Sequence, residues 1–400
     1  MKHTVVIGAG QAGASLVAKL RALGDTGAIT LIGAEAVPPY QRPPLSKAYL
    51  MGDLPAERLF LRPEAYYAEQ NIDLRLGQVV TAIDVAAQTV TVGGDVLAYD
   101  DLVLTTGSVP RRLPSAIGGD LGGVFTLRDL ADVDAMQPYF TAGKRVAIVG
   151  GGYIGLEGAA VAAKLGLDVT VVEMAPRILQ RVAAPETSDF FRDLHGAHGV
   201  KIIEATGLER LIGDGHVTAA RLTDGREIAA DFVMVGVGIM PATALAEAAG
   251  IALDNGIATD ALGRTNVPHV WAAGDCASFP TAAGRMRLES VPNAIDQAEC
   301  VAANILGADK PYVAEPWFWS DQYDIKLQIA GLNTGYDHIV TRRGEDAVSF
   351  WYYRGTQLLA VDAMNDPRAF MVAKRLLAAG KSPDAALASD PATDLKALLK

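Results

Sequence analysis

Cysteine is scarce in this sequence of 400 residues. Its two cysteines, Cys276 and Cys300, do not form a CxxC or CxxxxC pair. Disulfide scaffolds and dithiol redox centres depend on paired cysteines at characteristic spacings. We therefore expect neither of them, and we interpret both cysteines as small, partly buried residues.

Histidine is also scarce, with six residues in the chain. His195 and His198 form an HxxH pair, but no cysteine or carboxylate stands at ligand spacing from them. A zinc site needs three or four such ligands, so we predict no metal site. The sequence also shows no nucleophile beside a base, and we attribute Ser46, next to Lys47, to the loop in which both lie.

The chain has a deficit of positive charge, with a net charge of −11 at pH 7. Nucleic acids and anionic membranes bind basic surfaces, so we expect neither as a partner. No apolar run reaches the ~18 residues of a membrane-spanning helix. The apolar N-terminal stretch has the pattern of a strand and a glycine turn rather than of a signal peptide, and we expect a cytoplasmic protein.

What the sequence does contain is two glycine groups with the spacing GxGxxG. Each group stands between an apolar, strand-like run and a helix-like segment, and a second strand-like run then ends at an acid. In the first group these parts are residues 4–7, Gly8, Gly10 and Gly13, residues 14–24, residues 28–33 and Glu35. In the second they are residues 145–149, Gly150, Gly152 and Gly155, residues 156–166, residues 168–172 and Glu173.

This order of strand, glycine turn, helix, strand and acid is typical of dinucleotide-binding folds. The first glycine allows the tight turn, the second lets the backbone approach a pyrophosphate, and the third lets helix and strand pack closely. The helix N-terminus offers free N–H groups to the phosphates, and the acid accepts hydrogen bonds from a ribose. The sequence therefore predicts two dinucleotide sites. The alternative is two glycine-rich turns without a ligand.

Two dinucleotide sites in one chain predict two different cofactors. Two nicotinamides would have nothing to exchange, whereas a nicotinamide transfers hydride to a flavin. We therefore expect one flavin and one nicotinamide cofactor.

Six further segments resemble a known family. The more general ones are residues 102–111 (LVLTTGSVPR), 231–241 (DFVMVGVGIMP) and 270–277 (VWAAGDCA). The more specific ones are residues 39–50 (PYQRPPLSKAYL), 287–298 (RLESVPNAIDQA) and 318–331 (FWSDQYDIKLQIAG). Together they resemble the FAD-containing, NADH-dependent ferredoxin reductases of bacterial P450 and ring-hydroxylating dioxygenase systems. The resemblance covers about residues 3–375 and places FAD at the first glycine motif.

The resemblance implies an α/β fold with two Rossmann-like dinucleotide-binding domains and a C-terminal α+β domain. The expected boundaries are 1–108 and 239–310 for a discontinuous FAD-binding domain, 109–238 for an inserted NAD-binding domain, and 311–400 for the C-terminal domain. Most of the last domain has strand-like segments, followed by a helix-like one at 367–380. We expect the tail after it to be loosely ordered, with a last short helix.

The function that the resemblance implies is electron transfer. The protein takes hydride from NADH onto FAD and passes electrons singly to a [2Fe-2S] ferredoxin, which feeds a cytochrome P450 or another oxygenase. We expect a monomer and a transient complex that complementary charge steers. Because ferredoxins of this class are usually acidic, the candidate docking residues are Lys326, Arg342, Arg343, Lys374 and Arg375.

The resemblance also assigns roles to single residues. The matching lysine, Lys47, lies beside flavin N5 and pairs with Glu157, while Tyr153 stacks near the nicotinamide and Trp319 lies beside the flavin. Without the resemblance these four would be a loop lysine, a helix-start acid and two packing aromatics. The residues implied to contact a cofactor are Gly8, Gly10, Gly13, Glu35, Arg42, Lys47, Val80, Thr106, Gly107, Arg128, Gly150, Gly152, Ile154, Gly155, Glu157, Glu173, Arg181, Gly238, Gly274, Asp275, Val291, Pro292 and Trp319.

The acid at the second motif, Glu173, favours NADH over NADPH. NADPH has a phosphate where Glu173 would accept a ribose hydroxyl, and two unit charges about 4 Å apart repel by about 4 kcal/mol at an effective dielectric near 20. Arg177 and Arg181 follow closely and soften this preference.

Three other functions are compatible with a two-motif fold. A disulfide reductase needs a CxxxxC pair in the first third of the chain, which is absent. An NADH oxidase or peroxidase needs a lone cysteine near residues 40–47, where there is none. A non-catalytic, NADH-sensing flavoprotein would have a basic surface and a targeting segment, and we find neither pattern. The ferredoxin reductase interpretation remains the favoured one.

Overall fold

The computed structural model describes residues 2–399, and the chain divides into two compact units. Unit 1 consists of Met1–Gln41, Glu57–Val109 and Ile239–Pro316. Unit 2 consists of Arg42–Ala56, Pro110–Gly238 and Trp317–Lys400. Unit 2 therefore contains most of the segments predicted as the NAD-binding and C-terminal domains, together with residues 42–56. The boundaries of the three predicted domains stay a prediction.

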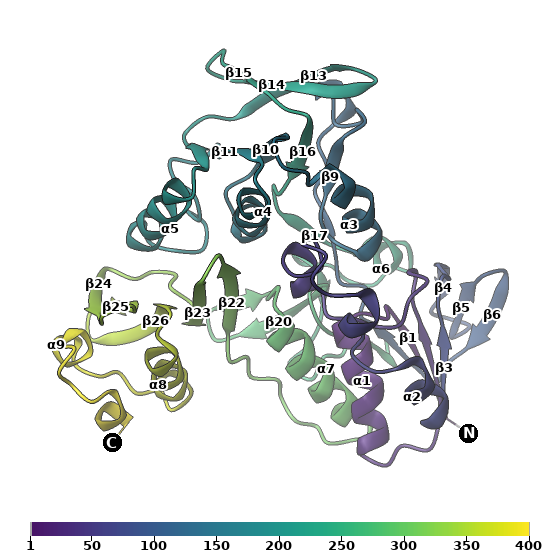
Figure 1. Ribbon diagram of the computed structural model, residues 1–400. Coiled ribbons are helices and arrows are strands. Elements are labelled where there is room, and N and C mark those ends of the chain that lie inside the picture. The colour runs from purple at the N-terminus through teal and green to yellow at the C-terminus, as the bar shows by residue number, and fades with distance from the viewer. Residues whose placement is uncertain (1, 400) are drawn as a thin grey trace. The chain divides into compact units, whose positions relative to one another are not determined.

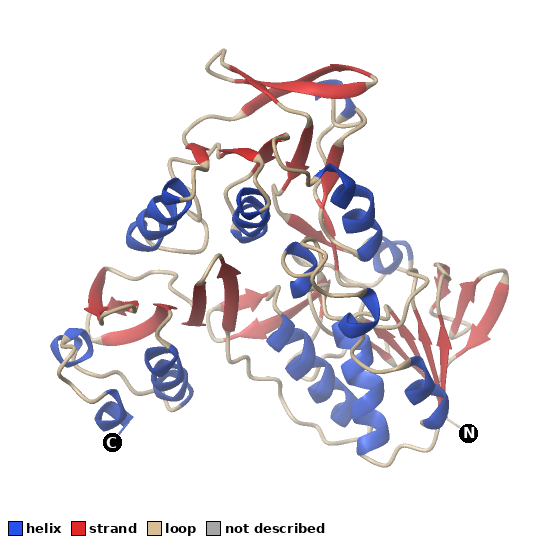
Figure 2. Cartoon of the chain, in the orientation of Figure 1, coloured by secondary structure: helices blue, strands red, loops and turns tan. Residues whose placement is uncertain are grey.

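A five-stranded parallel sheet forms the centre of unit 1 (Figure 1). Its strands, in spatial order, are β3 (Ile72–Arg75), β2 (Ala28–Ile32), β1 (His3–Ile7), β7 (Asp101–Leu104) and β19 (Val270–Ala272). Helices α1 (Gln11–Ala22) and α7 (Val291–Ile305) pack side by side on one face (Figure 2). The antiparallel strands β4 (Val80–Asp84), β5 (Thr89–Val92) and β6 (Asp95–Ala98) cover the other. A parallel sheet covered on both faces explains the almost purely apolar strand sequences.

Side chains of the central strands alternate between two cores, because successive residues of a strand point to opposite faces. Val6 and Val103 pack toward α1 and α7, whereas Val5, Ile7 and Leu104 pack toward β4 and β5. The loops that follow β1, β7 and β19 lie at the carboxyl end of the sheet. The remaining helices and strands here are α2 (Glu64–Glu69), α6 (Ala244–Ala248), β8 (Ser108–Pro110), β17 (Ile239–Pro241), β18 (Ile257–Ala258), β20 (Ala277–Thr281) and β21 (Gly284–Met286).

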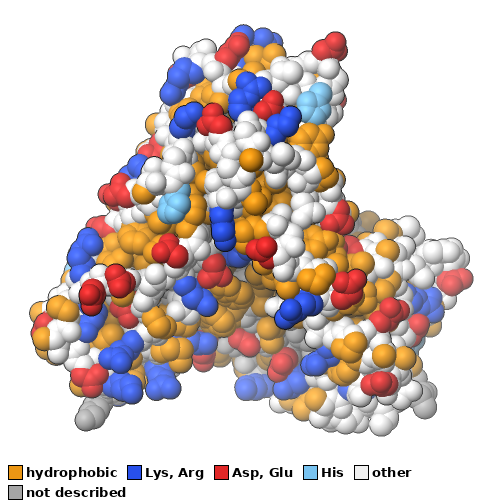
Figure 3. All heavy atoms as spheres, viewed as in Figure 1, with side chains coloured by type: hydrophobic (Ala, Val, Ile, Leu, Met, Phe, Trp, Pro, Cys, Tyr) orange, Lys and Arg blue, Asp and Glu red, His pale blue; other side chains and the backbone are white. Residues whose placement is uncertain are grey.

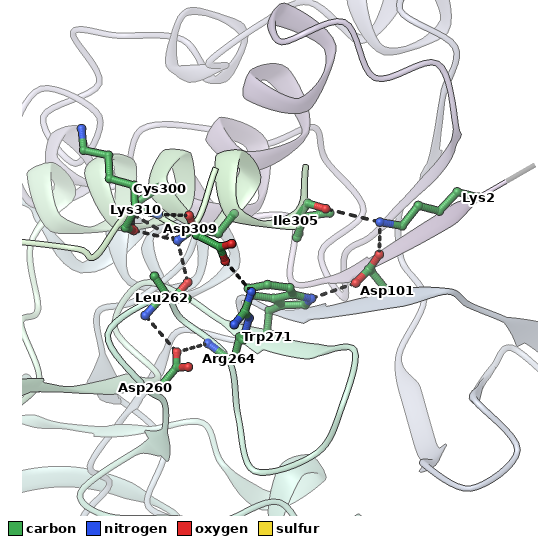
Figure 4. A network of polar contacts seen from close by, with 11 residues as sticks. Lys2, Asp101, Asp260, Leu262, Arg264, Trp271, Cys300, Ile305, Asp309 and Lys310 are labelled. Carbon is green, nitrogen blue, oxygen red and sulfur yellow. Dashed lines mark hydrogen bonds and ion pairs between the residues drawn. The ribbon is translucent and has the colours of Figure 1, made fainter. Parts of the chain in front are cut away.

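A network of polar contacts lies at the amino end of the same sheet (Figure 4). Asp101, at the start of β7, is 2% exposed, lies 2.6 Å from Lys2 Nζ, and accepts a hydrogen bond from Trp271 Nε1 at 2.9 Å. The Arg264 guanidinium lies 5.4 Å over the Trp271 ring and pairs with Asp309 at 2.8 Å. The buried charge of Asp101 is thus compensated at the amino end of the sheet.

Unit 2 contains a second five-stranded parallel sheet, and four of its strands follow one another in the same spatial order as in the sheet of unit 1. In spatial order they are β12 (Lys201–Ile203), β11 (Asp168–Val172), β10 (Arg145–Val149), β16 (Phe232–Val235) and β9 (Val124–Thr126). Its fifth strand, β9, precedes the others in the chain, whereas β19 follows the others in unit 1. The associated helices and strands are α3 (Leu130–Met136), α4 (Tyr153–Lys164), α5 (Pro185–Ala197), β13 (Leu208–Asp214), β14 (His216–Leu222) and β15 (Glu227–Ala229).

An antiparallel sheet forms the C-terminal part of unit 2. In spatial order its strands are β22 (Trp317–Gln322), β23 (Ile325–Gly331), β26 (Gln357–Met364), β25 (Val348–Arg354) and β24 (His338–Arg343). One face packs against α8 (Pro367–Ala378) and includes Trp351 and Tyr353. The other face includes Phe350 and Tyr352 and shares a core with Leu156 of α4 and Phe191 of α5.

The expectation of a loosely ordered tail is wrong, whereas its last short helix is present. Residues 381–399 form α9 (Ala385–Ser389) and a 3-10 helix (Leu395–Leu399), and Leu395 is buried. Arg342, on β24, donates to four backbone carbonyl groups of this segment. These are the carbonyls of Ala388, Asp390, Pro391 and Thr393. A guanidinium presents five donors in a fixed fork, so one side chain fixes several turns of backbone.

A buried carboxylate lies between the C-terminal sheet and α5. Asp362 of β26 accepts hydrogen bonds from Thr187 of α5 at 2.7 Å and from the Tyr352 hydroxyl. Its other oxygen has no hydrogen-bond partner among the described residues. Burial raises the pKa of Asp362 to about 6, although both hydroxyl donors act in the opposite direction.

We predict a pH-dependent stability difference between the wild type and Asp362→Asn. The pKa of Asp362 is higher in the folded than in the unfolded protein, so its favourable contribution is complete below pH 3.8 and is lost as the pH rises through about 6. Relative to the variant, the wild type should lose on the order of 3 kcal/mol between pH 4 and pH 7. Thermal unfolding of both proteins across this range measures the difference, and a constant difference would contradict the prediction.

Candidate functional site

The first glycine turn joins β1 to α1 in unit 1. Gly8 has a φ of +113°, and a Cβ placed on it would lie 2.1 Å from the carbonyl oxygen of Thr105, so only glycine fits. A Cβ on Gly13 would lie 2.1 Å from the carbonyl oxygen of Gly8. A Cβ on Gly10, in contrast, would meet no atom of the described chain within 4 Å. The outer glycines are therefore required by the fold, and the middle one leaves an open approach to the backbone.

The second turn, between β10 and α4 in unit 2, has the same geometry. Gly150 has a φ of +110°, and its Cβ would lie 2.4 Å from the carbonyl oxygen of Gly236. The Cβ of residue 155 would lie 2.1 Å from the carbonyl oxygen of Gly150, while the space beside Gly152 is again open within the described residues. Neither α1 nor α4 has an acidic residue in its first turn, so each helix presents its positive end to the turn.

The two predicted acids follow equivalent strands: Glu35 lies three residues after β2, and Glu173 lies directly after β11. Glu35 accepts a hydrogen bond from the Tyr40 hydroxyl at 2.5 Å. Glu173 accepts N–H groups with both oxygens, from Gly151 at 2.7 Å and from Ala175 at 2.7 Å. The Glu173 carboxylate is thus fixed against the glycine turn itself, where a ribose would follow the pyrophosphate.

Several other candidates of unit 1 follow the carboxyl ends of β7 and β19. Asp275, after β19, accepts a hydrogen bond from Ser108 at 2.8 Å, and Thr106, after β7, donates to the carbonyl of Ala242 at 2.7 Å. A Cβ on Gly274 would lie 2.9 Å from Ala12 of α1, which places this segment at the first turn. The remaining ones are Gly107 with a φ of +70°, Val80 at the start of β4, and Val291 and Pro292 at the start of α7.

A buried ion pair lies at the start of α4 in unit 2. Glu157, 3% exposed, lies 2.7 Å from Lys47 Nζ. Lys47 follows the 3-10 helix Pro43–Ser46 and also donates to the carbonyl of Pro43 at 3.2 Å. The sequence resemblance predicted this pairing, and the structure brings the two residues together.

Two serines complete the surroundings of Glu157, and neither was among the predicted site residues. Ser46 donates to Oε2 of Glu157 at 2.5 Å, and Ser320 of β22 donates to Oε1 at 2.7 Å. Ser46 lies in its predicted loop, and its hydrogen bond to Glu157 is a further contact that was not predicted from the sequence. Its position next to Lys47 was an available signal. Ser320 gave none, because its partner is 163 residues away.

The two predicted aromatic residues are associated with opposite faces of β22: Tyr153 of α4 packs against one face, and Trp319 belongs to the other. The Tyr153 ring packs on Phe318 with centroids 4.7 Å apart, and its hydroxyl is buried without a hydrogen-bond partner among the described residues. Burial raises the pKa of Tyr153 well above its usual value. Trp319 stacks on Trp317 at 5.6 Å, toward α8.

The remaining predicted residues of unit 2 lie in three places. Ile154 is 42% exposed at the second turn, and Gly238, with a φ of +99°, lies after β16 beside Arg181. Arg42 donates to the carbonyl of Arg128 at 2.7 Å. The structure thus brings Arg42 together with Arg128 and Gly238 together with Arg181.

The two histidines of the HxxH pair have different surroundings and different hydrogen-bond partners. His195 is fully buried and hydrogen-bonds through Nε2 to Gln322 at 2.8 Å, whereas His198 is exposed and contacts the carbonyl of Leu194. Burial lowers the pKa of His195 to about 4. Within residues 2–399 no group of three or more His, Cys, Asp or Glu side chains has the geometry to hold a metal ion, and no helix is long and apolar enough to cross a membrane.

Comparisons with known proteins agree with this geometry. Residues 2–298 match the family model described as pyridine nucleotide-disulphide oxidoreductase, and residues 317–399 match the one described as reductase C-terminal. A ferredoxin–NAD(P)+ reductase of Sphingomonas sp is 44% identical over 383 residues, covering 94% of this chain and 92% of the relative. Putidaredoxin reductase of Pseudomonas putida is 41% identical over 407 residues, covering 99% and 96%. The crystal structure of a covalent putidaredoxin reductase–putidaredoxin complex matches with a TM-score of 0.96 at 41% identity, covering 100% of this chain and 98% of that one.

Two dinucleotide-binding folds followed by a C-terminal sheet define a flavoprotein reductase that uses FAD and NAD(P)H. The chain belongs to the pyridine nucleotide-disulphide oxidoreductase family, and its relatives there are ferredoxin reductases. The predicted fold class, family and pair of cofactors are thus confirmed. The paired thiols in the family's description have no counterpart here, since the chain has only Cys276 and Cys300.

We predict different consequences for alanine at two glycines of the second turn. Gly152→Ala should leave thermal unfolding and FAD content unchanged, because its Cβ meets no described atom, but should raise the KM for NADH at least about tenfold by obstructing the pyrophosphate. Gly155→Ala should lower the thermal midpoint, because its Cβ would overlap the backbone of Gly150. Calorimetry and steady-state kinetics measure both effects. Normal NADH binding by Gly152→Ala would contradict the assignment of this turn.

Proposed function

We propose that this protein takes hydride from NADH onto FAD and passes the electrons one at a time to a [2Fe-2S] ferredoxin, which feeds a cytochrome P450 or another oxygenase. The observation that carries the proposal is the pair of glycine turns with equal geometry, one in each unit, because two dinucleotides in one chain are useful only if they exchange hydride. The ferredoxin reductases among the relatives support it.

In this proposal each unit holds one cofactor. The open backbone at Gly10 and the N-terminus of α1 would bind the FAD pyrophosphate, and Glu35 and Asp275 would bind the sugar portions. Gly152 and the N-terminus of α4 would bind NADH in the same way. Bound FAD supplies the conversion between a two-electron donor and a one-electron acceptor.

Lys47 and Glu157 have the chemistry for the reacting end of the site. Glu157 is buried and fixes Lys47 by an ion pair at 2.7 Å, so the ammonium group is held rather than mobile. A cation beside the flavin ring favours its reduced, anionic form. Hydride transfer itself needs no general base, so positioning and exclusion of water are the main tasks of Tyr153, Trp319 and their neighbours.

The partner in this proposal docks on a basic surface. The relative in the crystal structure is bound to putidaredoxin, and in Figure 3 basic side chains gather at the lower left, over α8 and the C-terminal residues. Lys326, Arg343 and Arg375 are exposed. Arg342 and Lys374 fit less well, because Arg342 binds the tail and Lys374 lies 4.7 Å over the Trp317 ring. We further propose a transient complex, a monomeric reductase and a cytoplasmic location.

The test of the function is NADH-driven reduction of cytochrome c with and without an added [2Fe-2S] ferredoxin. We expect strong dependence on ferredoxin. NADH consumption that is indifferent to ferredoxin and accompanied by peroxide turnover would instead favour an NADH oxidase or peroxidase. A slow response to NADH with a long-lived charge-transfer complex would favour an NADH-sensing protein.

We predict that Glu173 sets the preference for NADH. Glu173→Gln removes the charge that repels the 2′-phosphate of NADPH, so the ratio of kcat/KM for NADH to that for NADPH should fall on the order of tenfold or more. Glu35→Gln, the matched change at the first turn, should leave this ratio unchanged in FAD-loaded protein. Equal ratios in the wild type and Glu173→Gln would assign the preference to other residues.

A further inference from the structure

Glu157 is the end point of a longer polar chain inside unit 2. Beyond Ser320, the Gln322 amide donates to the Ser320 oxygen at 3.2 Å, and its carbonyl oxygen lies 2.8 Å from His195 Nε2. Nδ1 of His195 lies 3.1 Å from the Tyr323 hydroxyl. Ser320, Gln322 and His195 are each no more than 1% exposed. A buried polar chain of this length is costly unless every group in it is satisfied.

The donors of this chain have a single direction. An ionised carboxylate only accepts, so Ser320 donates to Glu157, and its oxygen accepts from Gln322. The Gln322 carbonyl then accepts the proton on His195 Nε2, which leaves Nδ1 to accept from Tyr323. Burial lowers the pKa of His195 to about 4, so the ring is neutral at pH 7 and its unprotonated Nδ1 accepts from the Tyr323 hydroxyl. Every dipole points its positive end toward Glu157.

The spacing of two elements makes this alignment possible. Phe318, Ser320 and Gln322 lie on one face of β22, where two residues advance by about 6.6 Å. Tyr153 and Glu157 lie on one face of α4, where four residues advance by about 6 Å. The pair Tyr153–Phe318 and the pair Glu157–Ser320 therefore meet in step, and Gln322 reaches His195 of α5 beyond them.

We propose that Ser320, Gln322 and His195 are positioning residues that act through Glu157 on Lys47. The inference rests on the proposed function, in which Lys47 lies beside the flavin. The chain fixes the Glu157 carboxylate from the side opposite Lys47, so Lys47 is held at one place during hydride transfer. The proposal assigns a positioning role to His195 of the HxxH pair and to β22 of the C-terminal sheet, although both lie outside the two glycine motifs.

The test uses the full-length, FAD-loaded protein and compares two buried serines of the C-terminal sheet. Ser320→Ala breaks the chain next to Glu157. Ser349→Ala is the matched control, because Ser349 is equally buried but donates to Asp366. We expect anaerobic reduction by NADH to slow about tenfold in Ser320→Ala and less than twofold in Ser349→Ala. We also expect the midpoint potential of bound FAD to become more negative only in Ser320→Ala.

A double-mutant cycle separates positioning from a general structural effect. In a Lys47→Met background, Ser320→Ala should slow reduction by less than a further factor of two, because its effect passes through Lys47. A full tenfold effect in that background, or equal effects of Ser320→Ala and Ser349→Ala, would overturn the inference. If the wild type itself is not reduced by NADH, the proposed function fails instead.

His195 offers a readout that does not depend on turnover. In the full-length protein, nitrogen NMR of labelled histidine should show His195 neutral, with its proton on Nε2, from pH 6 to pH 8. His195→Gln keeps a donor for Gln322 and should retain most of the reduction rate, whereas His195→Leu should resemble Ser320→Ala. A proton on Nδ1, or equal rates in His195→Leu and the wild type, would overturn the proposed direction of the chain.

Discussion

The burial of one carboxylate organises much of unit 2. A charge removed from water is tolerated only when paired and hydrogen-bonded, and Glu157 meets this requirement with Lys47, Ser46 and Ser320. These partners come from residues 42–56 and from β22, which are far from α4 in the sequence. The requirement explains why residues 42–56 belong to unit 2, although the chain on both sides of them belongs to unit 1. Further hydrogen bonds, such as Tyr49 to Asp134 at 2.7 Å, attach the same segment.

The two units share the arrangement of four sheet strands, but their fifth strands come from different parts of the sequence. Four strands occupy equivalent positions in both sheets. The fifth position is filled by β19 from the end of unit 1 and by β9 from the beginning of the inserted segment of unit 2. Both strands pair in parallel with a central strand, so the chain direction at that edge is conserved while its place in the sequence is not.

The parts of the structure that follow from local patterns were predictable from the sequence. The glycine spacings, the apolar strands and both acids require only neighbouring residues to be read together, and the resemblance supplied the Lys47–Glu157 pair. Ser320, Gln322 and the orientation of His195 were not predictable, because each depends on a partner more than 100 residues away. The tail was misjudged because its order depends on Arg342, which lies on a strand 46 to 51 residues earlier in the sequence. Polar composition predicts disorder only where no such partner exists.

The two faces of β22 have different side chains and different neighbours. Trp317 and Trp319 stack toward α8, while Ser320 and Gln322 face α4 and α5. Because the side-chain period of a strand is two, the insertion of one residue before Ser320 would place the Trp319 indole beside Glu157, and the loss of one would place the Asp321 carboxylate there. The connection that precedes it, around the 79%-exposed Val313, has no such register to keep. A change in chain length should therefore be tolerated before Trp317 but not within β22.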